Sequence, residues 1–436
     1  MKEEYNEQTQ QLTIECPKVS EKILKYFSKG VFLCKYFKAD TARTPKIVRY
    51  FKRALFFVEE GIGVRARKLL FRKTDIVSNR IVMATYQENY SCNCKYLADR
   101  ILEKNIDYQI IFIVSKDVFD NKDKYEVPNK IMLVQRNTVD SFYALASAHY
   151  WFDNALNCIW KEVPKKTGQI YINLWHGSLG IKKLSGNKRW RWKAKYGNEV
   201  IDYFATDSIF DEEVFSKSYW PKCKFLKVGH PRNDIFFDKN KVGDMRKKVC
   251  ETYNISPNMK IALYAPTFRD NKSDVSAINI DTELLRKTLE ERFGGQWVIL
   301  ARLHFHNINN EETRNHFAKQ NVIDASMYLD MQELMAASDV GITDYSSWIF
   351  DFLFTGKPAF IYAEDIEKYI NSRGFYYSLE ETPFLIADSN NKLRENILKF
   401  SESKFEEETE KFLGNKGCYE KGEACDGIIE FIESED

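Results

Sequence analysis

The turn at Ser346 and Ser347 has the residue types of an anion-binding site. Either serine would cap the helix predicted to follow, where free backbone N–H groups and the helix dipole favour a negative group. Asp351 lies one helical turn beyond Ser347 and is expected to face the same way. In a parallel sheet, a strand-turn-helix unit places its polar turn at the ligand crevice. An ordinary capped helix has the same pattern, so this stretch alone leaves both interpretations open.

Three of the six histidines directly follow predicted strands, which is where ligands bind in α/β domains. They are His176, His230 and His304. A neutral imidazole has a pKa suited to accepting a proton near neutral pH, so such a histidine can act as a general base. A histidine after a strand can equally bond loop carbonyls, and for any one of the three this alternative stands.

Two arginines occupy the same kind of position. Arg232 lies in the run 228–234 and Arg269 ends the run 264–269, each just past a predicted strand. The first run could also form an internal salt-bridged turn. Taken together with the serine turn and the histidines, however, these residues indicate an anion site with a proton-transfer group beside it.

The sequence contains no GxGxxG, Walker or HExxH motif, and no acidic pair stands at metal-ligand spacing. We therefore expect no metal and no cofactor. A bound diphosphate would be held by His, Arg and Lys side chains and by helix N–H groups.

Alternating strand and helix patterns from residue 80 onward predict the elements that position these residues. The economical architecture is two doubly wound, Rossmann-like α/β domains, over residues 80–240 and 241–436, facing each other across a cleft. Within the second domain, Val340–Thr343 is predicted to be the strand before the serine turn, and it closes an apolar run that starts at Met335. Gly356 and Pro358 are expected to stop the helix after it.

The length of 436 residues suits two domains, and the net charge of +2 argues against a polyanion binder. Nine scattered cysteines without zinc-site spacing indicate a reduced, cytosolic protein. We expect no signal peptide, and no run reaches the roughly 20 apolar residues of a spanning helix.

Residues 1–79 differ from the rest of the chain. Residues 1–16 are polar and expected to be loose, whereas residues 17–80 hold 17 Lys and Arg against 5 Asp and Glu. Apolar and aromatic residues alternate with this charge, which suits basic amphipathic helices on an anionic membrane surface. Packing of the apolar faces on the protein is an equal alternative. Nucleic acid is a weaker one, because no nucleic-acid motif follows, and we expect no such partner.

Several of these motifs occur in an order that resembles the CDP-glycerol glycerophosphotransferase family of teichoic-acid and capsule synthesis. The resemblance spans roughly residues 80–430 and rests on the following runs: Trp175-His176-Gly177, Gly229-x-Pro231-Arg232-Asn233-Asp234, Tyr264-Ala265-Pro266-Thr267-x-Arg269, Thr343-Asp344-Tyr345-Ser346-Ser347-x-x-x-Asp351 and Arg373-Gly374-Phe375-Tyr376. It implies a GT-B fold at the cytoplasmic face of the cell membrane. It also implies transfer of glycerol phosphate from CDP-glycerol to a hydroxyl of a lipid-linked or polymer acceptor, with release of CMP.

Carried over by position, the resemblance makes His176 the general base and His304 a second essential histidine near the donor phosphates. It places the phosphate-binding turn at Thr343, Ser346 and Ser347, with Asp351 in the same pocket and Arg269 flanking it. We expect His230 and Arg232 to contact substrate as well. Where the family usually has Asp-Asn-Pro-Lys, this chain has Cys92-Asn93-Cys94-Lys95.

Other functions remain open from the sequence. The motifs do not separate a CDP-glycerol donor from CDP-ribitol. A nucleotide-sugar glycosyltransferase on the same fold is a different enzyme class, which strict dependence on a CDP-alcohol would exclude. A membrane-docking scaffold with a degenerate site is a non-enzymatic alternative, against which the retained His176, His304 and serine turn argue.

Overall fold

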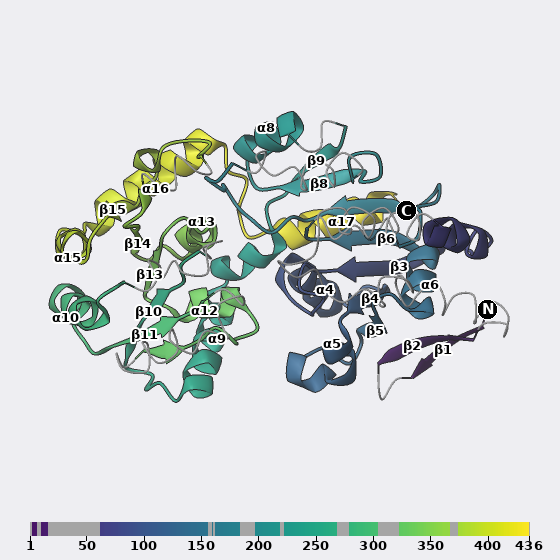
Figure 1. The fold of residues 1–436 in the computed structure, drawn as a ribbon, viewed down its shortest axis with the longest axis horizontal. Coiled ribbons are helices and arrows are strands. Elements are labelled where there is room, and N and C mark those ends of the chain that lie inside the picture. The colour runs from purple at the N-terminus through teal and green to yellow at the C-terminus, as the bar shows by residue number, and fades with distance from the viewer. Residues whose placement is uncertain are drawn as a thin grey trace, which may run out of the picture.

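The computed structural model describes ten stretches of the chain: 2–6, 10–15, 62–155, 159, 162–183, 197–218, 222–267, 279–303, 322–366 and 374–435. They form two α/β domains, each built on its own sheet, that lie side by side (Figure 1). This confirms the predicted two-domain architecture. The basic stretch 17–61 lies outside the described residues.

The first domain contains a nine-stranded sheet in the order β1-β2-β5-β4-β3-β6-β7-β8-β9. All its pairings are parallel except that of β1 with β2. The strands are β1 (Lys2–Asn6), β2 (Gln11–Glu15), β3 (Val77–Ala84), β4 (Gln109–Val114), β5 (Met132–Gln135), β6 (Ala148–Asp153), β7 (Ile170–Asn173), β8 (Tyr203–Thr206) and β9 (Lys224–Lys227). The helices are α4 (Cys92–Glu103), α5 (Lys116–Asp120), α6 (Val139–Ser147) and α8 (Ile209–Ser218), with 3₁₀ turns η1 (Lys122–Tyr125) and η3 (Pro231–Phe237).

The second domain contains a six-stranded, all-parallel sheet in the order β12-β11-β10-β13-β14-β15. The strands are β10 (Lys260–Tyr264), β11 (Trp297–Ala301), β12 (Ile323–Asp324), β13 (Val340–Thr343), β14 (Ala359–Tyr362) and β15 (Leu385–Ala387). The helices are α9 (Lys239–Tyr253), α10 (Thr282–Phe293), α12 (Met331–Ala337), α13 (Trp348–Phe352), α15 (Asn390–Leu398) and α16 (Glu402–Lys416), with 3₁₀ turns η6 (Leu353–Thr355) and η7 (Leu379–Glu381). The chain ends with helix α17 (Ala424–Glu435).

Both sheets follow the rule that a parallel strand covered on two faces is an unbroken apolar run. In β4, residues 110–114 are all buried, and all four residues of β13 are buried. Gly341 of β13 is needed for packing, because a Cβ there would lie 2.9 Å from the Phe352 ring. The helix after the serine turn therefore packs directly on its own strand, which fixes where the turn points.

The N-terminal residues are more ordered than expected. Residues 2–6 and 11–15 form an antiparallel hairpin, and β2 pairs with β5 at the edge of the first sheet. A helix over residues 62–70 leads into Phe71, which is buried in the core of the same domain. The prediction of loose residues at 1–16 is therefore wrong, and the described part of 1–79 belongs to the first domain.

The C-terminal helix α17 returns to the first domain, where it lies alongside β6 (Figure 1). The Tyr150 hydroxyl donates to the Ile432 carbonyl at 2.8 Å, and Arg100 of α4 forms an ion pair with Asp426 at 2.7 Å. The predicted domain 241–436 thus includes a helix that packs on the other domain. Glu420, between α16 and α17, accepts at 2.9 Å from the Asn233 side chain, which also bonds Asp351 of α13, so this crossover lies at the domain interface.

Candidate active site

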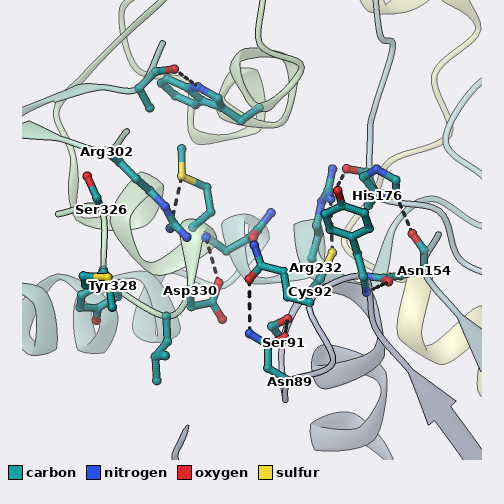
Figure 2. Close-up of a pocket in the computed structure, with 18 of the residues that line it drawn as sticks. Asn89, Ser91, Cys92, Asn154, His176, Arg232, Arg302, Ser326, Tyr328 and Asp330 are labelled. Atoms are coloured by element: carbon teal, nitrogen blue, oxygen red, sulfur yellow. Dashed lines mark hydrogen bonds between the residues drawn. The ribbon is translucent and has the colours of Figure 1, made fainter. Parts of the chain in front are cut away.

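A cleft of about 780 Å³ lies between the two domains, at the carboxyl ends of strands from both sheets. In Figure 2, His176, Asn154 and Arg232 lie on one side of the cleft, and Arg302, Ser326 and Tyr328 lie on the other. Of the predicted site residues, the structure brings His176, Arg232, Ser346, Ser347 and Asp351 together in the cleft lining. A doubly wound fold is expected to have its ligand cleft at the carboxyl ends of its parallel strands.

The backbone after β7 turns sharply and presents His176 to the cleft. Trp175 has a φ of +51°, in the left-handed region, and its N–H donates to the Asn173 side chain at 2.9 Å. The His176 Nδ1 lies 2.7 Å from the Asn154 carbonyl oxygen. Because a carbonyl only accepts, Nδ1 carries the proton, and Nε2 is the nitrogen that can take one from a substrate.

The environment of His176 keeps its imidazole neutral. Burial lowers the pKa of His176 to about 4, opposed by the bond to Asn154 and helped by the positive charges of Arg232 and His230. The Tyr86 ring stacks on the imidazole with centroids 5.8 Å apart and an interplanar angle of 12°. A neutral, oriented imidazole is the form that general-base catalysis needs.

The serine turn faces the same cleft from the second domain. As predicted, one serine of the turn, Ser347, is the N-cap residue of α13, and its side chain makes no capping hydrogen bond. Among the described residues, neither the Ser346 nor the Ser347 hydroxyl has a hydrogen-bond partner, although both line the cleft. The turn thus offers hydroxyl and backbone N–H donors to a ligand. As predicted, Gly356 ends the helical segment, in a left-handed conformation.

The neighbouring residues of the turn are structural. Thr343 is fully buried and donates to the Ala265 carbonyl at 2.7 Å, so it supports the turn and does not line the cleft. Asp344 accepts from the Thr267 N–H at 2.9 Å and from its hydroxyl. Lys182 of the first domain reaches the same hydroxyl at 3.2 Å. This places a cation beside the turn.

Asp351 and Arg232 form a buried ion pair across the two domains. The Arg232 guanidinium lies 2.7 Å from the Asp351 carboxylate, which is 1% exposed. Asn233 also donates to Asp351, at 3.1 Å. The alternative of an internal salt-bridged turn is therefore wrong for Arg232, whose ion-pair partner comes from the other domain.

His230 lies behind the cleft and is not among the residues that line it. Its Nδ1 is 3.5 Å from Asp207 and 3.6 Å from Glu420. Although burial lowers it, these two carboxylates raise the pKa of His230 to about 10, so the imidazole is charged. The expectation that His230 contacts substrate does not fit this position.

The carboxylates around His230 are also the described group closest to a metal-binding arrangement. The ligand atoms of Asp207, His230 and Glu420 all lie within 4.8 Å of one another. The Nδ1 of His230 lies 3.1 Å from the Ser178 hydroxyl as well. A protonated imidazole beside these two carboxylates balances their charge without an ion.

Two predicted site residues, Arg269 and His304, lie outside the described residues and stay predictions. The structure adds Asn93, which the sequence analysis did not select. Its side chain is fully buried and donates to the Leu174 and Trp175 carbonyls at 2.8 and 2.9 Å. The signal available in the sequence was the altered run 92–95, in which Asn93 retains the family's residue.

A family model described as CDP-Glycerol:Poly(glycerophosphate) glycerophosphotransferase matches residues 66–434. The chain is 30% identical over 394 residues to the teichoic acid poly(glycerol phosphate) polymerase of Bacillus spizizenii, covering 84% of this chain and 96% of that protein. It is 28% identical over 365 residues to the teichoic acid glycerol-phosphate transferase of Staphylococcus aureus, covering 79% and 90%. It spans about half of a larger relative, the Bacillus subtilis polymerase, with 26% identity and 47% of that protein covered.

The fold is similar to that of the wall teichoic acid polymerase TagF. A solved structure of that protein matches with a TM-score of 0.70 and 26% sequence identity, covering 89% of this chain and 98% of that chain. A variant of the same polymerase soaked with CDPG matches with a TM-score of 0.71. The GT-B fold implied by the resemblance is therefore confirmed. The chain belongs to the CDP-glycerol:poly(glycerophosphate) glycerophosphotransferase family.

Proposed function

We propose that the chain transfers glycerol phosphate from CDP-glycerol to a hydroxyl of a lipid-linked or polymer acceptor in teichoic acid synthesis, with His176 as general base. Family membership supports the donor and the reaction. The observation that carries the assignment of roles is the pairing of two features across one cleft. A neutral His176, whose Nε2 has no hydrogen-bond partner among the described residues, lies on one side. The Ser346 and Ser347 hydroxyls, also without a partner among those residues, lie on the other.

The two features are close enough to act on one substrate. A Cβ on Gly177, the residue after the base, would lie 3.5 Å from the Ser347 hydroxyl. The acceptor oxygen attacks the β-phosphorus while its proton passes to His176 Nε2. The bond from that phosphorus to the bridging oxygen breaks, and CMP leaves with the electron pair. Removing a proton in this way contributes typically ~10²–10⁴-fold to the rate.

The donor side neutralises the charge that develops on the phosphate oxygens. In our proposal the N–H groups at Ser346 and Ser347, which line the cleft, take this role, together with the Lys182 ammonium beside Thr267. His304 and Arg269 complete the site in our proposal. Preorganised donors of this kind are commonly the largest contribution to phosphoryl transfer.

The test is incubation of the full chain with labelled CDP-glycerol or CDP-ribitol and lipid-linked or polymer acceptors, while CMP release is followed. We expect acceptor-dependent release with CDP-glycerol. Several relatives are named as ribitol-phosphate enzymes, for example the Bacillus spizizenii ribitol-phosphate primase, so the CDP-ribitol arm is the matched comparison. Faster release from CDP-ribitol, or from a UDP-sugar, would replace the proposed donor.

We further propose that the protein acts at the cytoplasmic face of the membrane as a peripheral protein. Within the described stretches, no helix has the length and apolar character to cross a bilayer. The helix over 62–70 leaves Ile62 49% and Leu69 70% exposed, and Arg65 and Lys68 are exposed as well. Apolar groups beside cations suit an anionic bilayer surface, where each Lys or Arg contributes about 1 kcal/mol.

Vesicle sedimentation tests this location. We expect binding to anionic but not neutral vesicles, with less binding at high salt. Charge reversal should also weaken it, either at Arg65 and Lys68 or in the basic stretch at Lys22, Lys25, Lys29, Lys35 and Lys38. Transfer to a short soluble acceptor should be unchanged in these variants. Equal binding to both kinds of vesicle, or to neither, would contradict the proposal.

A further inference from the structure

We propose that Asn93 and Arg232 form a positioning clamp that ties the base-bearing loop to the donor-binding helix, and that Arg232 acts through His176 and not as a substrate ligand. This inference rests on the proposed role of His176 as base. It differs from the role that the resemblance implied for Arg232.

The clamp first holds three consecutive backbone carbonyls, those of His176 and of the two residues before it. The Asn93 amide donates to the Leu174 and Trp175 oxygens at 2.8 and 2.9 Å. Arg232 donates to the next oxygen, that of His176, at 2.7 Å. The two clamping residues also bond each other, because the Arg232 N–H donates to the Asn93 side chain at 3.1 Å. The left-handed turn at Trp175 is thereby held on both sides.

The second part is the link to the other domain. One terminal nitrogen of Arg232 serves His176 and lies 3.5 Å from the Cys92 sulfur, and the other lies 2.7 Å from Asp351 of α13. Arg232 is 5% exposed, and of its guanidinium nitrogens only Nε lacks a partner among the described residues. The Arg232 guanidinium therefore has few donors available to bind a phosphate. Its planar geometry suits two fixed acceptors, here the His176 carbonyl and the Asp351 carboxylate.

Asp351 is held from the base loop a second time. The Ser178 hydroxyl, two residues beyond His176, also donates to it. Asp351 lies on α13, whose N-terminus is the serine turn. The base loop and the donor-binding helix are thus joined at two points, which fixes the distance between base and diphosphate. Misplacement by about 1 Å can cost ~100-fold in rate, so such a link has catalytic consequences.

Arg232 also affects the base electrostatically. The groups that face His176 are Tyr86, Asn154 and Trp175, which are uncharged, and Arg232 and His230, which are positive. Both cations lower the pKa of His176. Loss of the Arg232 charge should therefore raise that pKa and move the acid limb of the pH–rate profile to higher pH.

The experiment compares Arg232→Met and Arg232→Lys in the full chain, measuring kcat, donor KM and the pH dependence of CMP release. Arg232→Met should lower kcat about 100-fold with little change in donor KM, and should shift the acid limb upward. Arg232→Lys should lower kcat while the limb stays near its original pH, because the charge remains. Arg100→Lys, in a surface ion pair with Asp426, is the matched control and should leave both unchanged.

A second variant separates geometry from charge. Asn93→Ser removes the two carbonyl bonds without altering charge, so kcat should fall while the acid limb stays in place. Asn79→Ser is its control, since Asn79 is half-buried, lies outside the cleft lining and bonds only the Asp107 carbonyl among the described residues. If Arg232→Met fails to fold, as judged by a thermal melt, Asn93→Ser and Asp351→Asn decide the matter. Unchanged kcat in both would overturn the clamp.

The remaining outcomes distinguish this inference from the proposed function. A folded Arg232→Met protein with a raised donor KM, normal kcat and an unshifted limb would make Arg232 a substrate ligand. Full activity of His176→Ala would overturn the base itself. An inactive His176→Ala beside fully active Arg232→Met and Asn93→Ser would overturn the clamp alone.

Discussion

On the first-domain side of the cleft, His176 is held by contacts made before any substrate binds. On the second-domain side, the Ser346 and Ser347 hydroxyls make none with the described residues. Asn154 fixes the tautomer of the base, and the loop that carries it is bonded by Asn93 and Arg232. The serine turn is instead supported from below by Thr343, which leaves its own donors free. The difference follows from what each side must do.

A general base works only in one tautomer and one charge state, so its surroundings must be complete in the free enzyme. A site for a diphosphate must keep its donors unpaired, because the ligand has to satisfy them. The comparison therefore predicts that damage to the first side reduces turnover, whereas damage to the second side reduces binding as well. The following changes test it.

The largest expected effect is that of His176→Ala, which should lower kcat by ~10²-fold or more and leave CDP-glycerol affinity nearly unchanged. The base acts on the acceptor hydroxyl, and the donor is bound on the opposite side. Turnover and calorimetric donor binding should be measured on the same preparation. His149→Ala, on β6 and outside the cleft lining, is the matched control. Near-normal turnover in a folded His176→Ala protein would remove His176 from the mechanism.

A smaller effect is expected from the double change Ser346→Ala and Ser347→Ala. Each hydroxyl contributes about 0.5–1.5 kcal/mol as a hydrogen-bond donor, so donor affinity should fall roughly tenfold and turnover should fall with it. His304→Ala should behave similarly. Isothermal calorimetry with CDP-glycerol measures the change, with exposed Ser403→Ala as control. Unchanged donor affinity in both variants would place the diphosphate elsewhere.

The buried charge behind the base should appear as a pH dependence of stability. The pKa of His230 is raised to about 10 from an ordinary value of 6.5. A raised histidine pKa stabilises the folded state fully below about pH 6.5, and this stabilisation is lost as pH rises towards about 10. Urea unfolding should therefore show a free energy that falls across this window. His230→Gln should flatten the fall and His149→Gln should not; an equal slope in both would argue against a charged His230.

The smallest effect is expected from chelation. Neither side of the comparison uses a metal ion in our proposal, so transfer should survive EDTA at least in part. CMP release before and after chelation, with readdition of magnesium or manganese, is the measurement. Total loss of transfer that only these ions restore would mean that a metal site takes part. Asp207, His230 and Glu420 would then be the first described residues to substitute.

Strands and helices with a clear period were predictable from the sequence. The alternating strand and helix patterns predicted from residue 80 onward are present as the strands of the two sheets and the helices between them. The strand before the serine turn was predicted at Val340–Thr343, where β13 lies, but the apolar run that leads into it, Met335–Ala337, ends helix α12. Residues 332–337 are all buried, so the run has no polar face to reveal a helical period. The short polar strands β1 and β2 were missed because their pairing depends on β5.

Some features of the site were also predictable from the sequence, and others were not. The residue types at strand ends determined that His176, Ser346 and Ser347 would face a cleft, because the carboxyl ends of parallel strands meet there whatever the rest of the chain does. Only the tertiary structure decided which charged residues face substrate and which face each other. Arg232 and Asp351 come from different domains and His230 is enclosed by Asp207 and Glu420, pairings that no local pattern encodes. An unpaired buried charge is costly, so each of these charged residues needs a partner. The partners come from segments that are far apart in the sequence and meet only when the two domains pack together.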